Sequence, residues 1–262
     1  MKTRLDAELV RRELARSREH AADLIESRSV IVSGIPATKP ASQVDAETSI
    51  VLQGDRDDFV SRGGHKLAGA LDIFTGVEIA GRTCLDAGAS TGGFTDVLLR
   101  RGAKLVVAVD VGYGQLAWEL RQDARVKILD RTNIRHLSGD QISEDIDLVV
   151  ADLSFISLSL VLPALAAVSR PDADFVLMVK PQFEVGREKL GAGGVVRDPA
   201  LRRAAVLDIA ESAYDVGLGT LGIAASPLPG PAGNVEYFLW LRRGAPEINE
   251  QALDDAIAAG PE

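Results

Sequence analysis

The residues best suited to chemistry in this chain begin with a glycine-rich segment, CLDAGASTGGFTDVLL, at positions 84–99. An apolar run leads into Asp86, glycines follow at positions 88, 92 and 93, and then an amphipathic helical pattern begins. Glycines at such a turn permit unusual backbone dihedrals and let a ligand approach the main chain closely. The segment therefore predicts a nucleotide-type binding loop at the carboxyl end of a buried strand.

The spacing of these glycines indicates which cofactor the loop binds. A dinucleotide site would have G-x-G-x-x-G and a helix N-terminus facing pyrophosphate, whereas this chain has G-x-x-x-G-G directly after an acid. Asp86 is badly placed for phosphates but suits a cofactor with an ammonium, a sulfonium and no phosphate. Asp110 and Asp130 end the next two predicted strands, where they could address ribose hydroxyls and an adenine edge. The predicted cofactor-binding set is Asp86, Gly88, Ser90, Thr91, Gly92, Gly93, Asp110, Asp130 and Asp152; the alternative is a glycine-rich turn with structural acids.

A sulfonium methyl donor leaves the acceptor open, and three chemistries can be compared. Methylation of pyrimidine C5 needs a cysteine nucleophile, but Cys84, the only cysteine, lies inside an apolar run and reads as buried. Methylation of base amino groups favours an Asn/Asp-Pro-Pro-aromatic turn, and residues 152–155 read Asp-Leu-Ser-Phe instead. Hydroxyl methylation needs a group that orients or deprotonates an alcohol, and a lysine can do this if its pKa falls.

Four charged residues fit hydroxyl methylation. Lys180 ends the apolar run VLMVK before Pro181, Asp152 ends a neighbouring run, and Lys66 and Glu236 flank the region. Strand ends face the crevice where ligands bind in open α/β sheets. Two lysines in one site would lower the pKa of one of them by like-charge repulsion. Each residue alone reads better as a surface charge or ion pair, but together they predict a catalytic set of Lys66, Asp152, Lys180 and Glu236.

The elements that must position these residues alternate regularly. Apolar runs at 83–87, 105–110, 126–129, 148–152 and 175–180 predict strands, and amphipathic patterns at 94–101, 115–123, 158–168 and 201–216 predict helices. Such alternation is typical of an α/β fold with a doubly wound, mostly parallel, Rossmann-like sheet. Residues 221–225 and 236–241 are joined by the turn-rich SPLPGPAGN, which favours an antiparallel pair at the end.

The first 56 residues predict a separate small α+β domain. Helical patterns at 5–14 and 17–25 precede strand-like runs at 30–32 and 50–52. We divide the chain into this domain at 1–56, a linker at 57–60, the α/β domain at 61–245 and a tail at 246–262 with a loose terminal helix. Net charge is −9, which argues mildly against a nucleic-acid partner, but residues 1–56 carry nine basic and nine acidic residues, so the acid excess lies in the larger domain.

Composition excludes several classes of protein. One cysteine cannot form an intrachain disulfide, three scattered histidines show no metal spacing, and we expect no metal. No apolar run approaches the roughly 18 residues of a membrane span, and the charged start MKTRLDAELV does not read as a signal peptide. We therefore expect a cytoplasmic protein.

Several long blocks together resemble the TlyA family of FtsJ-like ribosomal RNA 2′-O-methyltransferases, whose members often carry the name haemolysin. The blocks are SRGGHKL, LDAGASTGGFTDVLL, DVGYGQLAW, VADLSFISL, VKPQFEVG and ASPLPGPAGNVEYFLWL. The resemblance implies S-adenosylmethionine as cofactor and the ribose 2′-hydroxyl of cytidines in 16S and 23S rRNA as acceptor. It maps a Lys-Asp-Lys-Glu tetrad onto the catalytic set above, with Lys180 as the base or orienting group.

The N-terminal domain resembles an S4 RNA-binding domain, so ribosomal RNA or ribosomal subunits are the expected partner. Its basic residues could meet phosphates, or they could form a solvated helix face. The candidate set is Arg4, Arg11, Arg12, Arg16, Arg18 and Lys39. The rivals to this interpretation are a methyltransferase for another RNA or RNA atom, a membrane-active haemolysin, and a non-catalytic rRNA-binding assembly factor.

Secondary candidates remain open. The loop GREKLGAGGVV at 186–196 could close over RNA or could simply connect its neighbours. Tyr113 and Phe155 could stack on adenine or on the target base. Trp118 lies within a predicted helix, and we expect it to be a core residue.

Overall fold

The computed structural model describes residues 2–12, 14–15, 17–26, 28–45, 48–52 and 59–261. The chain divides into two compact units, residues 1–58 and 59–262, and each is described by itself. The candidate residue Arg16 and positions 57–58 of the predicted linker lie outside the described residues.

The first unit packs two helices against short strands. Helices α1 (Leu5–Arg11) and α2 (Arg18–Glu26) accompany a three-stranded antiparallel sheet of β3 (Ile35–Pro36), β2 (Val30–Val32) and β5 (Ile50–Leu52). A second pair joins β1 (Thr3–Arg4) and β4 (Gln43–Val44). The core consists of apolar side chains from both helices and β2, including Leu5, Leu9, Ala21, Ile25 and Val30. The helix and strand positions predicted for this region are confirmed.

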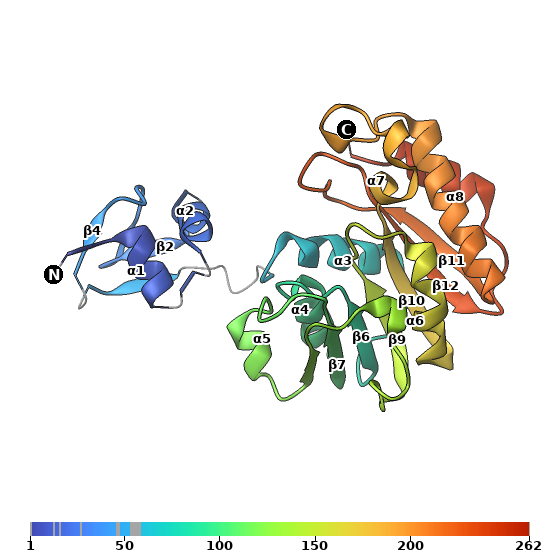
Figure 1. The fold of residues 1–262 in the computed structure, drawn as a ribbon, viewed down its shortest axis with the longest axis horizontal. Helices are drawn as coiled ribbons and strands as arrows, with labels where there is room; N and C mark the ends of the chain where they lie inside the picture. Colours follow the sequence, from blue (N-terminus) through green and yellow to red (C-terminus); the bar gives the residue numbers. More distant parts are fainter. Residues whose placement is uncertain are drawn as a thin grey trace. The chain divides into compact units, whose positions relative to one another are not determined.

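The second unit is built on a seven-stranded sheet, which confirms the predicted Rossmann-like α/β fold (Figure 1). Its order is β11-β12-β10-β9-β6-β7-β8. The five strands from β10 to β8 are parallel, whereas β12 is antiparallel to both of its neighbours, as the turn-rich connection predicts. The bounds are β6 Thr83–Ala87, β7 Leu105–Val109, β8 Val126–Leu129, β9 Ile146–Ala151, β10 Ser169–Val179, β11 Leu218–Ala225 and β12 Tyr237–Arg243.

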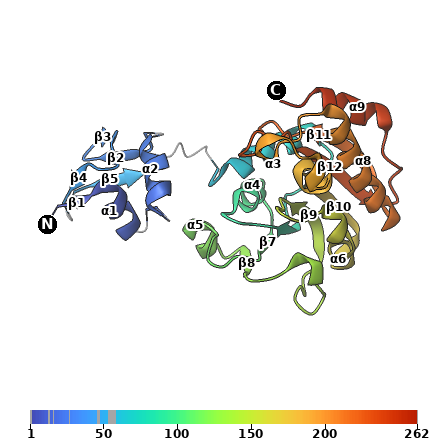
Figure 2. The ribbon, with the colours of Figure 1, turned by 45° about the horizontal axis from the view of Figure 1, so that its top comes forward.

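Helices cover both faces of this sheet (Figure 2). Helices α6 (Leu162–Ala167), α8 (Pro199–Asp215) and α9 (Glu250–Ala258) contribute to one apolar core. Helices α3 (Arg62–Ile73), α4 (Gly93–Arg100) and α5 (Trp118–Gln122) contribute to the other. Alternate residues of one strand serve different cores, as Cys84 and Leu85 do. Because both faces are covered, the parallel strands read as continuous apolar runs.

Short helices complete the unit near the carboxyl ends of the strands. Helix α7 (Pro181–Glu184) follows β10, and 3-10 turns occur at η1 (Ile134–His136), η2 (Leu158–Leu160), η3 (Arg187–Lys189) and η4 (Ala192–Gly194). The predicted helix at 158–168 is therefore a 3-10 turn followed by α6.

Three sequence expectations need correction. Helix α3 was not expected, because its glycines at 63 and 64 lower helix propensity; burial of Leu67, Ala70 and Leu71 stabilises it. Trp118 is 70% exposed rather than a core residue, because α5 begins at Trp118 and the buried positions go to Leu116 and Leu120. The terminal helix is packed rather than loose, since α9 buries Leu253 in the core with α8.

The packing of α9 can be tested with Leu253→Ala. Leu253 is fully buried, so we expect its truncation to lower the free energy of unfolding by about 2–5 kcal/mol. Tryptophan fluorescence during urea unfolding reports on this unit, because both tryptophans, at 118 and 240, lie in it. The exposed Gln251→Ala is the control, and equal effects of the two substitutions would contradict the packed helix.

Candidate active site

The glycine-rich loop connects β6 to α4, as predicted. Gly88 and Gly92 have φ angles of 86° and 98°, a region that favours glycine. A Cβ atom at Gly88 would lie 2.7 Å from the backbone oxygen of Asp152. The Gly88 amide donates to the carbonyl of Val109 on the next strand at 2.8 Å. The loop is therefore held close to the ends of the neighbouring strands and leaves its main chain open to a ligand.

Asp86 lies fully buried under this loop. Its Oδ2 accepts a hydrogen bond from Thr95 Oγ1 at 2.6 Å, while its Oδ1 has no hydrogen-bond partner among the described residues. Burial raises the pKa of Asp86 to about 7, although the Thr95 hydrogen bond opposes the shift. A buried carboxyl oxygen without a partner is costly unless a ligand satisfies it.

The other two predicted cofactor acids are bound by loop amides. Asp110 accepts from the amides of Ser90 at 2.8 Å and Gly112 at 2.6 Å. Asp130 accepts from the Gly114 amide at 3.0 Å and lies 3.8 Å from Arg121. These bonds fix the loops that follow β6, β7 and β8 relative to one another.

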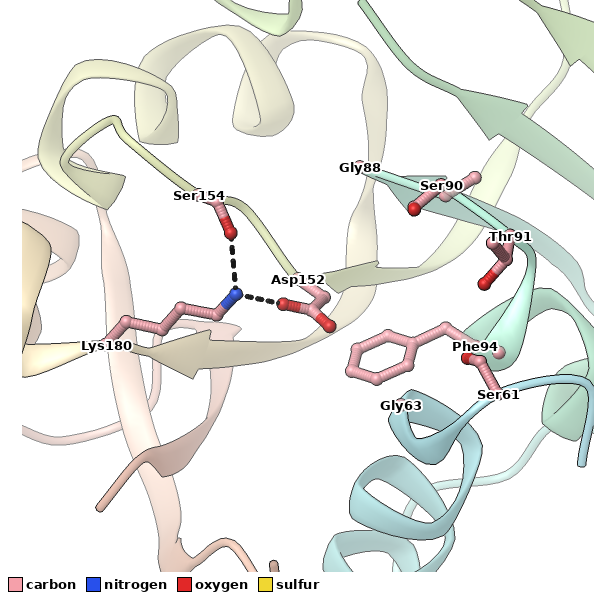
Figure 3. A pocket seen from close by; sticks show the side chains of 11 residues that line it. Ser61, Gly63, Gly88, Ser90, Thr91, Phe94, Asp152, Ser154 and Lys180 are labelled. Carbon is pink, nitrogen blue, oxygen red and sulfur yellow. Dashed lines mark hydrogen bonds and ion pairs between the residues drawn. The ribbon is translucent and has the colours of Figure 1, made fainter. Parts of the chain in front are cut away.

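A pocket of about 170 Å³ opens between this loop and the ends of β9 and β10 (Figure 3). Ser90 and Thr91 line one side, and Asp152, Ser154 and Lys180 line the other. The full lining is Ser61, Gly63, Gly88, Ala89, Ser90, Thr91, Gly93, Phe94, Asp152, Ser154 and Lys180. The pocket thus brings Asp152 and Lys180 together with part of the glycine loop, whereas Lys66 and Glu236 are not among its lining residues.

The four predicted catalytic residues form two ion pairs. Lys180 Nζ lies 2.5 Å from Asp152 Oδ1 and donates to Ser154 Oγ at 3.0 Å (Figure 3). Lys66 Nζ lies 2.6 Å from Glu236 Oε2, and both side chains are buried. Each lysine therefore has its own carboxylate partner, a pairing that the sequence did not specify.

Sequence reasoning missed two polar partners of these groups. Ser154 holds the Lys180 amine, and Gln182 Nε2 donates to Glu236 Oε1 at 3.3 Å. Both lie in the blocks DLSF and VKPQF, two residues after Asp152 and Lys180 respectively, so their closeness to predicted catalytic residues was the available signal.

The secondary candidates occupy different surroundings. Phe155 is 91% exposed with φ at 64°, and its ring centre lies 5.1 Å from that of Phe183. The loop 186–196 is held by the buried Asn234, which accepts from the Val196 amide at 2.9 Å and donates to the Gly194 carbonyl at 3.1 Å. Closure of this loop over RNA stays a prediction.

The candidate RNA-binding arginines of the first unit gather around two buried acids. Arg4 and Arg18 both bind Asp6, at 2.8 and 2.9 Å. Arg11 and Arg12 both bind Glu8, at 2.6 and 2.7 Å, and they hold the pKa of Glu8 at about 2. Each carboxylate thus orders two guanidinium groups and neutralises half of their charge. The remaining candidate, Lys39, is exposed and follows β3 in the sequence.

Comparisons with known proteins agree with this arrangement. The family model for FtsJ-like methyltransferases matches residues 59–243, and that for S4 domains matches residues 3–50. The 16S/23S rRNA (cytidine-2′-O)-methyltransferase TlyA of Mycobacterium tuberculosis is 57% identical over 258 residues, which cover 98% of this chain and 96% of that protein. The chain belongs to the TlyA family of FtsJ-like methyltransferases.

More distant TlyA relatives extend the comparison. The 23S rRNA (cytidine-2′-O)-methyltransferase TlyA of Campylobacter jejuni is 31% identical, covering 86% of this chain and 93% of that protein. A solved structure from Streptococcus thermophilus, named as a hemolysin, has a TM-score of 0.77 and 37% identity, covering 98% of this chain and 94% of its own. Within the described part of this TlyA-family chain, no helix is both long enough and apolar enough to cross a membrane.

Membership of this family implies S-adenosylmethionine as the methyl donor, and the residues present fit it. The buried Asp86 oxygen that has no partner and the acids after β7 and β8 supply hydrogen-bond acceptors. The glycines of the loop leave its main chain open to the cofactor. No group of three or more metal-binding side chains occurs among the residues the structure describes.

The environment of Asp86 predicts a pH effect on stability. Because its folded pKa is raised to about 7 from an ordinary value near 4, its ionisation destabilises the ligand-free fold as pH rises from about 4 to 7. Asp86→Asn should therefore raise the free energy of unfolding at pH 8 by roughly 2–4 kcal/mol and change it little at pH 4. Urea unfolding at both pH values measures this, and Asp96→Asn is the control for a carboxylate that is paired with Arg100. An effect of Asp86→Asn that is equal at both pH values would rule out the buried ionisation.

Proposed function

We propose that this protein transfers the methyl group of S-adenosylmethionine to the ribose 2′-hydroxyl of cytidine in 16S rRNA, 23S rRNA or both. The observation that carries this proposal is the Lys180 amine, held by Asp152 and Ser154 on the pocket wall opposite the glycine loop. The Mycobacterium tuberculosis relative, named a 16S/23S rRNA (cytidine-2′-O)-methyltransferase, supports the same substrate. A cytoplasmic location, where ribosomal RNA is available, is part of the proposal.

The cofactor would lie along the glycine loop. Asp86 would accept from its ammonium group, directly or through water, because its Oδ1 lacks a partner. Gly88, Ser90, Thr91, Gly92 and Gly93 supply the loop surface. Asp110 and Asp130 keep acceptor capacity for the ribose hydroxyls and adenine edge, since each carboxylate oxygen can accept more than one hydrogen bond. When bound, S-adenosylmethionine supplies an electrophilic methyl group on its sulfonium.

Lys180 would orient the acceptor. Its Nζ is fixed by two oxygens, so it can present a defined position to a ribose 2′-hydroxyl that enters the pocket. The 2′-hydroxyl would lose its proton as its oxygen takes the methyl group that the cofactor supplies. The Lys180–Asp152 pair can accept this proton, because the ammonium can pass one proton to Asp152 while the amine takes up the hydroxyl proton.

Lys66 and Glu236 would shape the site without taking that proton. Their pair is more deeply buried than the Lys180–Asp152 pair, and Gln182 holds the second Glu236 oxygen. A fixed dipole in this position can orient the substrate ribose, because it costs no reorganisation during the reaction. Phe155 presents an open ring beside Ser154, where the target base can stack.

The S4 unit would bind the RNA backbone. Around Asp6 and Glu8, four guanidinium groups meet two carboxylates, which leaves a net positive charge with exposed N–H donors. Such ordered arginines suit phosphate contacts, to which Arg16 and Lys39 would add.

Substitution of Lys180 tests the catalytic proposal. Purified protein would be incubated with radiolabelled S-adenosylmethionine and separate ribosomal subunits from an unmodified strain, and the product would be mapped with nucleases. Lys180→Ala should reduce ribose labelling by about 10²–10⁴-fold, because it removes the group that orients and deprotonates the hydroxyl. Cofactor affinity should be retained.

The exposed Lys104→Ala is the matched control, and it should label the subunits like the wild type. Label on a base would refute the 2′-hydroxyl mechanism. Full activity of Lys180→Ala would remove Lys180 from catalysis, and no label from cofactor-binding wild-type protein would favour a non-catalytic rRNA-binding factor.

The RNA-binding role of the S4 unit predicts a change in salt dependence. Arg18→Ala removes one exposed guanidinium while leaving Asp6 paired with Arg4, so binding to rRNA should weaken and the slope of log K against log salt should fall by about 1. Filter binding at several salt concentrations measures the slope. Lys104→Ala, an exposed lysine before β7, should leave it unchanged; equal slopes for wild type and Arg18→Ala would contradict the role.

A further inference from the structure

Trp118 is an exposed aromatic residue that the proposed chemistry leaves unused. It is 70% exposed, and Tyr113, five residues earlier, is 67% exposed. Both lie in the connection between β7 and the first turn of α5. Exposure of two large aromatic rings in one short segment is costly in water, which indicates a surface that meets a partner.

This segment is held firmly to the cofactor loop and to the loop after β8. The Ala117 amide donates to the Thr91 carbonyl at 3.1 Å, directly before Trp118. The Arg131 amide donates to the Gly112 carbonyl at 2.9 Å, directly before Tyr113. Between the two rings, the side chain of Leu116 is buried and anchors the segment. The two rings are therefore displayed from a fixed backbone beside the cofactor loop.

The charges around these rings fit a nucleic acid. The Arg131 guanidinium lies 4.3 Å from the centre of the Tyr113 ring, and Arg135 is exposed on the adjacent turn η1. The carboxylates of Asp110 and Asp130 are directed toward the loop amides from which they accept, and the exposed Glu119 is the acidic residue of α5 itself. Exposed rings next to arginine are the combination on which single-stranded RNA stacks.

The position of Trp118 also says which nucleotide it can meet. Helix α5 lies toward the β7–β8 side of the sheet, whereas α7, which follows Lys180, lies on the other side (Figure 1). The Thr91 contact places Trp118 on the cofactor-loop side of the pocket, across from Lys180 and Ser154. A nucleotide whose ribose reaches Lys180 therefore has its neighbours, rather than its own base, near Trp118.

We propose that Trp118 stacks on an unpaired nucleobase flanking the methylated nucleotide, with Arg131 binding the adjoining phosphate. This inference rests on the proposed function, in which the substrate is RNA. It adds a second stacking position to that of Phe155 and would make methylation depend on unpaired sequence around the target.

Tryptophan fluorescence tests the contact directly in the full chain. The chain has two tryptophans, and Trp240 donates to the buried Asp174 at 2.8 Å in the middle of β12, so Trp118 is the exposed reporter. The probe is an unstructured twelve-nucleotide oligocytidylate, titrated with S-adenosylhomocysteine present. We expect quenching in the wild type, loss of that quenching with nearly unchanged affinity in Trp118→Phe, and about 5- to 150-fold weaker binding in Trp118→Ala.

Three controls separate the alternatives. Trp118→Ala should bind S-adenosylhomocysteine with unchanged Kd; an equal loss there would assign Trp118 to the cofactor site and overturn the proposal. Arg131→Asn, which tolerates the positive φ of 54°, should reduce the salt slope of oligonucleotide binding by about 1. Glu119→Ala, a neighbouring exposed substitution, should not weaken binding.

The remaining outcomes are distinct from failure of the proposed function. No binding of the probe by wild-type protein, unchanged affinity in Trp118→Ala, or quenching that persists in Trp118→Phe would each overturn the stacking. Wild-type protein that shows the Trp118-dependent binding but does not methylate ribosomal subunits would support the stacking and refute the proposed substrate. Methylation of ribosomal subunits by the wild type, with an unchanged KM in Trp118→Ala, would support the proposed substrate and refute the stacking.

Discussion

The parallel register of β6 with β7 and β9 is the constraint on which the site depends. Ala87 pairs with Val109 on one side and with Ala151 on the other. The next residues along the three strands, Gly88, Asp110 and Asp152, must therefore emerge in one row. Main-chain hydrogen bonds from Gly88 to Val109 and from Asp152 to Ala87 continue that row past the strand ends. A shift of one residue in any of these strands would turn the acids into the apolar core.

Buried charge is the second feature that organises the molecule. Glu236, Lys66 and Asp174 are all nearly inaccessible, and each is paired: Asp174 with Arg82, Arg242 and the Trp240 indole, Glu236 with Lys66. Loss of one partner from such a pair leaves an uncompensated buried charge, which costs about 3–5 kcal/mol. Asp86 is the exception, because one of its oxygens has no protein partner. Among these buried charged groups, Asp86 is thus the one whose open oxygen is available to a ligand.

The sequence predicted the strands that consist of continuous apolar runs. The strand β6 agrees with its predicted residues, because all five of them are buried. The strand β8 agrees as well, although it is a half-buried edge strand that contains Lys127. Helix α3 could not be predicted from propensity, since Gly64 is required by close packing: a Cβ there would overlap Phe59. Exposure of Trp118 depends on where a five-residue helix begins, which periodicity does not resolve.

The fold brings Asp152, Lys180 and the glycine loop to one pocket, but the partners of the predicted catalytic residues follow from three-dimensional geometry. Nothing in the spacing assigns Lys180 to Asp152 and Lys66 to Glu236, because those pairs join positions 28 and 170 residues apart. The spacing likewise does not predict the roles of Asp6 and Glu8. These buried acids bind arginines that the sequence presents as separate charges.

The antiparallel strand β12 has a consequence for the topology of the chain. Val179 of β10 pairs with Tyr237 of β12. Because the strands are antiparallel, Lys180, which follows Val179, and Glu236, which precedes Tyr237, lie at the same edge of the sheet. Their relative position is set by that direct pairing and not by the long connection through α7, α8 and β11. A longer turn at an exposed position such as Gly217 would therefore leave Lys180 and Glu236 at the same edge of the sheet. The relative position of these two residues belongs to the sheet, and it tolerates insertions in the chain that joins the strands.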